Sequence, residues 1–417
     1  MIGPAPAMRY ESLDAIRGVA VMGILAMNIV AFGMPFAAYS NPVAGGPVGS
    51  LDLGTWFLNF VAVDSKMRGL FSMLFGASTL LVIESATAAG RSAAGTHYSR
   101  MFWLAIFGLI HFYLIWFGDI LFLYAICGLF LFAFRNLSPK ALTIWAIAFF
   151  IVGTGFLGSA WAMMAAAEAG TLPAELTREM QAGLAEMNAE MGPGAASYAR
   201  DVAIYLGSYA EIVGHRTGEM ASEPFIAVMM FLWETVGLML IGMALFKSRM
   251  LTGEWEAARY RKWALIGFLV GIPPLILLAT YQIDAGFSAV STFGASLTLS
   301  VPFDVAMTIG WAALIMLLIK TAANDAVRAR LAATGRMAFT NYLTTSIVMT
   351  TIFYGYGLGL FGSVGRTALY LFCFGMWAAM LLWSKPWLER FQYGPLEWLW
   401  RSLSRWRVQP MRKIAAA

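Results

Sequence analysis

Charged residues are scarce in this sequence of 417 residues. Asp, Glu, Lys and Arg together make up 12% of the chain, whereas a soluble domain usually carries about 25%. Hydrophobic residues make up 60%, and so few charges cannot keep that much apolar surface away from water. The composition therefore excludes an ordinary soluble protein. The net charge of +5 does not indicate nucleic-acid binding, because the basic residues lie between apolar runs and in the C-terminal tail.

Cysteine and histidine are also rare. Cys127 and Cys373 are the only cysteines, both lie within apolar runs, and the sequence has no CxxC motif or Cys/His cluster. This excludes a disulfide framework and a cysteine-based zinc site, and we expect no bound metal. Of the three histidines, we place only His111 deep within an apolar run, and we expect His97 and His215 to lie in loops.

The sequence does contain a series of separate apolar runs. Their lengths of about 17 to 25 residues suffice for a helix that crosses a roughly 30 Å hydrocarbon core. They predict an all-α transmembrane bundle of about ten spans. The predicted spans lie near residues 18–38, 67–88, 101–117, 119–134, 141–164, 225–246, 263–281, 302–320, 338–360 and 366–384.

The distribution of Lys and Arg predicts the orientation of these spans. Basic residues collect in alternate loops and in the C-terminal tail, and such loops stay in the cytoplasm, so both termini are expected there. The chain then divides into four parts. These are an N-terminal bundle (1–164), an extracytoplasmic helical cap (165–224), a C-terminal bundle (225–384) and a basic, Trp-rich tail at the membrane surface (385–417).

Ionisable side chains within spans cost about 2.5–3.5 kcal/mol each on insertion scales, so each needs a partner or a task. Arg17 stands at the cytoplasmic mouth of the first span, where it suits a phosphate-bearing ligand and, equally, a pair with Asp14. Asn28 lies eleven residues deeper, near mid-membrane, where its amide must find a partner across helices. Both are candidate binding residues.

A second polar group opens the second span. Asp64 and Arg68 are four residues apart and can pair on one helical face, which would satisfy both charges. Lys66 and Arg68 nevertheless lie on the side of the membrane where basic residues are disfavoured. That placement makes Asp64, Lys66, Arg68 and the neighbouring Ser72 candidate binding residues.

The third group surrounds His111. Gly118 and Asp119 interrupt a long apolar run and predict a helical hairpin, in which His111 and Asp119 can line one cavity. His111 is then either a general base that titrates near neutral pH or a hydrogen-bonding group between helices. Trp116 and Tyr124 of the same stretch are candidate binding residues.

The fourth group opens the ninth span. Arg336, Asn341 and Tyr342 lie in the stretch Gly-Arg-Met-Ala-Phe-Thr-Asn-Tyr-Leu-Thr-Thr-Ser. Polar groups that join helices are the usual explanation of such a pattern. The three residues are also candidates for contact with a substrate.

At these places the chain resembles the YeiB family of bacterial membrane proteins, whose biochemical activity is unknown. The resemblance rests on LDAIRG near residue 13, FSMLFGAS at 71–78, H-x4-W-x-GDIL-x2-YA at 111–125, GRMAFTNYLTTS, YGYGLGLFG and FQYGPLEWLWRSL. It covers nearly the whole chain. It implies a multi-pass protein of the bacterial inner membrane.

The first span also looks like that of membrane acyltransferases, in which Arg or Lys is followed by ten residues and then His. Here Arg17 is followed by ten residues and then Asn28. The larger superfamily includes the lysosomal heparan glucosaminide acetyltransferase and moves an acyl group from cytoplasmic acyl-CoA to an acceptor. The likeness implies that Arg17 holds a CoA phosphate. Asn28 cannot take up a proton as His does, so the base is His111 or is absent.

Three functions therefore remain open. The first is transfer of an acyl group from acyl-CoA to a lipid-linked or exported acceptor, with His111 and Asp119 in catalysis. The second is a transporter or lipid-handling protein, in which Asp64, Arg68, His111 and Asp119 line a path and no bond is made. The third is a structural membrane component. Membrane lipid is an expected partner, and a homodimer is one assembly that the sequence leaves open.

Overall fold

The computed structural model describes residues 10–321 and 324–413, and this part of the chain is helical, with no strand. Eight helical segments are long and apolar enough to cross a membrane. The protein is therefore a polytopic helical bundle. The eight segments are α1 (Glu11–Gly33), α3 with α4 (Ser50–Ala62, Lys66–Ala88), α5 with the π-helix η1 (Ala93–Ile110, His111–Ile115), α7 (Pro139–Glu168), α11 (Glu223–Lys247), α12 (Ala257–Asp284), α14 (Val301–Thr321) and α17 (Arg366–Arg390).

The other two predicted spans correspond to shorter helices. They are α6 (Leu121–Phe134) and α16 (Ala338–Phe353). The connection before α16 is itself a helix, α15 (Asp325–Arg336), and only Met337 separates the two helices. The Asn324 side chain accepts hydrogen bonds from the first backbone N–H groups of α15 and so starts the helix.

Helix α15 packs tightly against α1. A side chain at Gly18 would collide with the backbone carbonyl of Leu331, and one at Gly335 would collide with that of Asp14. The two glycines therefore let the helix backbones touch, which is the usual way for helices to associate in a membrane.

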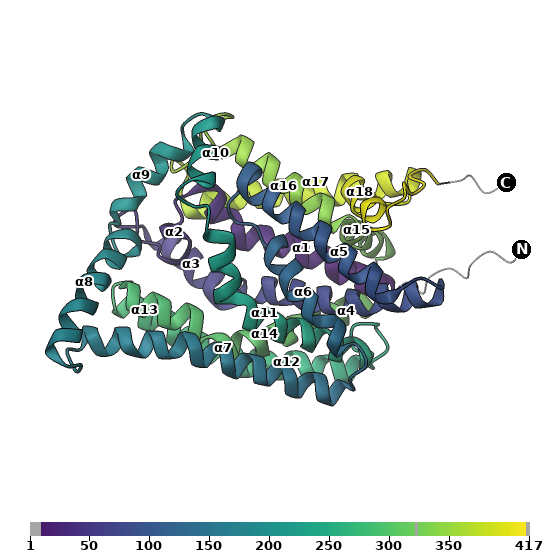
Figure 1. Cartoon of the computed structure of the whole chain (residues 1–417), viewed down its shortest axis with the longest axis horizontal. Coiled ribbons are helices and arrows are strands. Elements are labelled where there is room, and N and C mark those ends of the chain that lie inside the picture. Colours follow the sequence, from purple (N-terminus) through teal and green to yellow (C-terminus); the bar gives the residue numbers. More distant parts are fainter. Residues whose placement is uncertain (1–9, 322–323, 414–417) are drawn as a thin grey trace, which may run out of the picture.

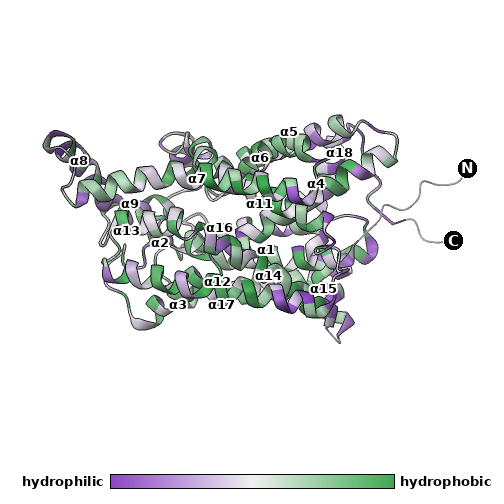
Figure 2. Ribbon diagram, turned by 90° about the horizontal axis from the view of Figure 1, so that it is seen from below, coloured by the Kyte–Doolittle hydropathy of each residue, from purple (hydrophilic) through white to green (hydrophobic). Residues whose placement is uncertain are grey.

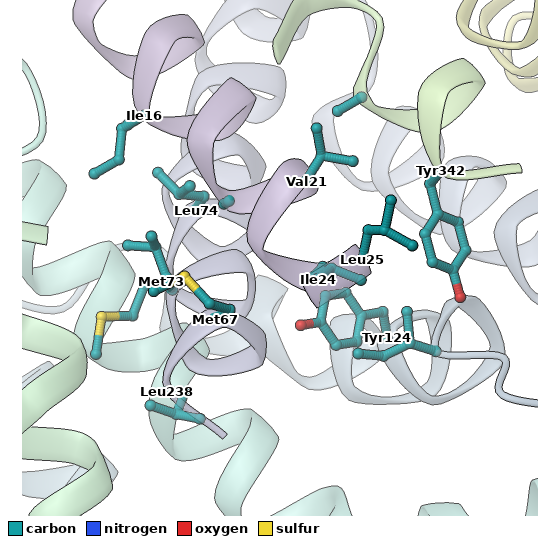
Figure 3. Close-up of a cluster of buried hydrophobic side chains, with 14 of the residues drawn as sticks. Ile16, Val21, Ile24, Leu25, Met67, Met73, Leu74, Tyr124, Leu238 and Tyr342 are labelled. Atoms are coloured by element: carbon teal, nitrogen blue, oxygen red, sulfur yellow. The ribbon is translucent and has the colours of Figure 1, made fainter. Parts of the chain in front are cut away.

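Helix α1 forms the centre of the bundle and contacts α4, α15, α16 and α17. Figure 3 shows its apolar side chains, among them Val21, Ile24 and Leu25, grouped with Tyr124 of α6 and Tyr342 of α16. Helix α7, by contrast, lies at the edge of the bundle, and much of its surface is exposed. The most protected helix thus carries Arg17 and Asn28.

The two ends of the bundle differ (Figure 1). Helices α15 and α18 (Pro395–Ser404) lie at one end, which we call the basic end. Helix α1 begins at this end too, because its first residue, Glu11, pairs with Arg328 of α15. The opposite end, the cap end, carries α8 (Ala174–Met191), α9 (Ala196–Tyr205) and α10 (Tyr209–Thr217). Figure 2 shows hydrophilic residues on α8 and near α15, with apolar helices between them.

The remaining helices are short. Helix α2 (Ala37–Ser40) follows α1, and α13 (Ala289–Gly294) runs into a second π-helix, η2 (Ala295–Leu299), before α14.

The orientation predicts a labelling pattern. A cysteine that replaces the exposed Ala185 of α8 should react with an impermeant thiol reagent in intact cells, because the distribution of basic residues predicts that the cap end faces outward. Cysteines at the exposed Ala88 and Ala258, near the basic end, should react only after the membrane is permeabilised. Cys127 and Cys373 are fully buried and give little background. Labelling at Ala88 or Ala258 in intact cells would contradict the predicted orientation.

Candidate functional site

The hairpin between α5 and α6 brings His111 and Asp119 together. Helix α5 passes into the π-helix η1 at His111, and the chain then turns through residues 116–120 to start α6. π-Helical turns of this kind are often found at functional sites. Three hydrogen bonds attach the hairpin to the cap end: Tyr209 donates to Leu114 O, Arg216 donates to Phe112 O and Tyr113 donates to Ala221 O.

His111 is held from both sides. Its Nδ1 lies 2.8 Å from Asp119 Oδ1, and its Nε2 lies 2.9 Å from the hydroxyl of Ser346 on α16. The other oxygen of Asp119 accepts the backbone N–H of Phe122 in the first turn of α6, where the helix dipole favours a carboxylate. Both side chains are shielded from solvent, with exposed fractions of 0% for His111 and 2% for Asp119.

A cavity of about 530 Å³ begins at the basic end. It is bounded by α1, α4, α5, α6, the junction of α15 and α16, and α18, and its walls are mostly apolar. Four arginines line it: Arg17, Arg100, Arg336 and Arg401. The carboxylates of Asp14 and Glu397 also line it, so the cavity combines an excess of positive charge with a mostly apolar wall.

Hydrogen bonds and ring contacts fix these arginines. Arg17 pairs with Asp14 at 2.8 Å and donates to Ser78 of α4, so the pair that the sequence allowed is present, and the phosphate-binding role stays a prediction. Arg100 stacks on Trp400 of α18, with its guanidinium carbon 3.9 Å from the ring centroid. Arg336 donates to the backbone carbonyl of Gln392.

The cavity ends at two tyrosines. Tyr124 and Tyr342 line its deep end, and the Tyr342 ring lies 5.2 Å from the His111 ring, centroid to centroid. His111 itself does not line the cavity, so Tyr342 forms the wall between the two. Tyr124 shares a hydrogen bond of 2.6 Å with Ser72 of α4.

The polar group at the start of α4 is organised differently from the prediction. Ser65 has a positive φ of 60°, so helix α4 begins at Lys66 and Asp64 is not on it. The predicted pairing of Asp64 with Arg68 on one helical face is therefore wrong. Asp64 instead accepts a hydrogen bond from Tyr39, and Arg68 pairs with Glu234 of α11 at 2.9 Å. 

Lys66 also finds its partner on another helix. Its ammonium lies 2.6 Å from Asp304 of α14, and both side chains are almost completely buried. A pair in such surroundings holds α4 and α14 together, because either charge alone would be strongly unfavourable there.

Asn28 and Asn341 differ in how their amides are used. Asn28 is half-buried, and within the described part of the chain its side chain makes no hydrogen bond, so the partner across helices that we expected for it is not found there. Asn341 is fully used as a bridge between helices, because its amide donates to Thr334 O and Ser384 Oγ and accepts from Trp383. The structure thus supports the packing role of Asn341.

Several residues that contact the predicted site residues were not predicted from the sequence. Glu234 and Asp304 lie inside predicted spans, and the cost of a buried charge could have identified both of them. Ser346 gave no such signal, because hydroxyl groups are common in membrane helices. His97 is not in a loop: α5 begins at Ala93, and His97 is buried one turn later against the carbonyl of Gly128.

Comparisons with known proteins show which family this chain belongs to. The chain is 32% identical over 404 residues to the uncharacterized protein YeiB of Escherichia coli, covering 95% of this chain and 96% of that protein. The chain belongs to the YeiB family. It is also 31% identical to the uncharacterized protein YxaH of Bacillus subtilis, covering 97% of this chain and 96% of YxaH.

The family model described as a protein of unknown function (DUF418) matches residues 245–407. No solved structure matches the chain. The function of this YeiB-family protein must therefore be inferred from its own geometry. Across residues 10–321 and 324–413, no cluster of three or more His, Cys, Asp or Glu side chains is arranged to hold a metal ion.

The buried pair of Lys66 and Asp304 predicts a specific stability pattern. Asp304→Leu leaves the Lys66 ammonium without its partner and should lower the free energy of unfolding by about 3–5 kcal/mol, whereas Lys66→Met with Asp304→Leu should recover most of that loss. Thermal unfolding in detergent measures both. Glu254→Gln, which breaks the exposed pair with Arg249, is the control and should change little. Equal losses in the single and double variants would contradict the pairing.

Proposed function

We propose that this protein is a membrane acyltransferase that takes its acyl donor from the basic end of the bundle. The observation that carries the proposal is the cavity: four arginines line it, most of its wall is apolar, and it ends one tyrosine ring away from His111 and Asp119. The proposed donor is acyl-CoA, and the proposed acceptor is lipid-linked or exported.

The lining of the cavity suits a donor of this chemistry. Guanidinium groups bind phosphates through paired hydrogen bonds, and Arg17 and Arg100 offer them from two different helices. The pantetheine arm, which links the CoA phosphates to the thioester, would lie along the interior against residues such as Leu74, Leu104 and Leu121. The thioester at the end of that arm would then approach Tyr342.

His111 is the proposed general base. Asp119 accepts from Nδ1, which leaves Nε2 free to take a proton. A base must lie within hydrogen-bond reach of the proton that it removes, and Nε2 already contacts a hydroxyl at 2.9 Å. Asn28 has no part in this step, because an amide does not accept a proton at any useful pH.

The position of the cap supports an acceptor that comes from the other side of the membrane. Helix α10 lies against η1, with the Tyr209 hydroxyl on Leu114 O, so the cap end reaches the hairpin that carries His111. Donor and acceptor would then meet at His111 from opposite ends of the bundle.

The alternative function, transport without bond formation, would need the charged residues to line one path. Arg68 is instead paired with Glu234, Lys66 with Asp304, and Asp64 is bound by Tyr39. Charges paired in this way are occupied in holding helices together. This arrangement favours the acyltransferase over the transporter.

The proposed donor site predicts a binding defect. Arg17→Ala should weaken acyl-CoA binding by about 10- to 100-fold, because hydrogen bonds to charged groups contribute about 1.5–3 kcal/mol. Arg17→Lys should recover only part of the affinity, since a point charge does not replace the planar fork. Titration calorimetry with the detergent-solubilised protein measures the dissociation constants.

The control for this experiment is Arg249→Ala, which removes an exposed arginine that does not line the cavity and should leave the affinity unchanged. If the parent protein has no measurable affinity for acyl-CoA, or if Arg17→Ala binds as tightly as the parent, the proposed donor site is wrong.

A further inference from the structure

Three side chains from separate elements form a continuous line of hydrogen bonds. Asp119 precedes α6, His111 opens η1 and Ser346 lies in the middle of α16, 235 residues from His111. The contacts measure 2.8 Å from carboxylate to imidazole and 2.9 Å from imidazole to hydroxyl. A carboxylate that orients a histidine and a histidine that contacts a serine are the arrangement by which enzymes activate a serine nucleophile.

The hydrogen bonds define the direction of proton transfer. An ionised Asp119 can only accept, so the ring proton of His111 is on Nδ1. Nε2 then carries a lone pair that faces the hydroxyl of Ser346. That hydroxyl has one proton to donate, and Nε2 at 2.9 Å is closer than its other acceptor, the carbonyl of Tyr342 at 3.3 Å. His111 is therefore placed to remove the proton of Ser346.

A buried donor without a partner lies beside this line. The indole N–H of Trp116 is enclosed, and within the described part of the chain no acceptor contacts it. The ring stacks on Phe32 and lies 6.1 Å from the His111 ring, centroid to centroid. Its N–H is therefore available to a ligand oxygen near His111.

We propose that Ser346 is the nucleophile of this protein and forms a covalent acyl-serine during transfer, an inference that rests on the proposed acyltransferase function. The Ser346 oxygen attacks the thioester carbonyl while Nε2 of His111 takes the hydroxyl proton. The carbon–sulfur bond then breaks, and the proton passes to the departing CoA thiolate.

The second half of the reaction reverses these roles. An acceptor hydroxyl or amine attacks the acyl-serine, His111 takes the acceptor's proton, and the proton returns to Ser346 when the ester bond breaks. Trp116 donates to the carbonyl oxygen, on which negative charge develops in both halves. Ser346 lies one helical turn beyond Tyr342, so the acyl group reaches it when the Tyr342 ring moves aside.

Two reagents test the proposal on the full-length protein in detergent. The first is acyl-CoA without an acceptor, which should leave an acyl group on the peptide that contains Ser346, detected by mass spectrometry. The second is a fluorophosphonate, which modifies activated serines whether or not acyl-CoA is the donor.

Ser346→Ala should abolish both modifications, and His111→Gln should slow them at least 100-fold. Trp116→Phe should slow acylation by about 100-fold, because it removes one donor to the oxyanion.

Two further variants separate chemistry from folding. Thr350→Val alters a buried hydroxyl one turn further along α16 and should leave both modifications unchanged. Ser346→Cys should still take up the acyl group, now as a thioester that hydroxylamine removes. If Ser346 has only a structural role, neither reagent modifies it in the parent protein, and Ser346→Cys takes up no acyl group.

The outcomes distinguish this inference from the function on which it rests. If acyl-CoA binds in the titration but neither reagent modifies Ser346, the covalent route is overturned and the proposed donor site stands. If acyl-CoA does not bind but the fluorophosphonate modifies Ser346 in a His111-dependent way, the nucleophile stands and the donor is wrong. If acyl-CoA does not bind and Ser346 is not modified, both are overturned.

Discussion

The absence of water within a membrane is the constraint on which this structure depends. Polar groups at that depth can be satisfied only by other parts of the protein, and the charged side chains of this bundle do so by tying two elements together. Lys66 joins α4 to α14, Arg68 joins α4 to α11, and His111 joins the α5–α6 hairpin to α16. The same pairings that allow charges inside the bundle also set the relative positions of its helices.

The site at His111 depends on contacts from both ends of the bundle. At the cap end, α10 covers the hairpin through hydrogen bonds to backbone carbonyls that the π-helical turn leaves accessible. At the basic end, Glu397 of α18 accepts the backbone N–H groups of Phe339 and Thr340 and so caps α16, the helix that carries Tyr342 and Ser346. Burial raises the pKa of the Glu397 carboxyl, and the hydrogen bonds from Thr340 oppose that rise. The C-terminal segment therefore both lines the cavity and fixes the helix behind it.

The tryptophans of this segment have a related role. Trp400 stacks under Arg100 and donates its N–H to the carbonyl of the same residue, and Trp398 donates to the carbonyl of Gln409. The Trp400 contacts hold α18 against α5 beside the cavity, and the Trp398 contact holds the chain that follows α18 against that helix. A tail that composition alone assigned to the membrane surface thus also forms part of the candidate site.

The sequence by itself determined the class of the protein, because long apolar runs with few charges have no stable alternative to a helical bundle in a membrane. It also selected His111 and Asp119, since ionisable groups in such runs are costly and a Gly-Asp break predicts a turn. It could not determine which charges pair: Asp64 and Arg68 fit a helical spacing, but the left-handed Ser65 separates them. Only the tertiary structure placed Ser346 against His111 and Asp304 against Lys66, because contacts between residues more than 200 positions apart depend on how the helices pack and not on local spacing.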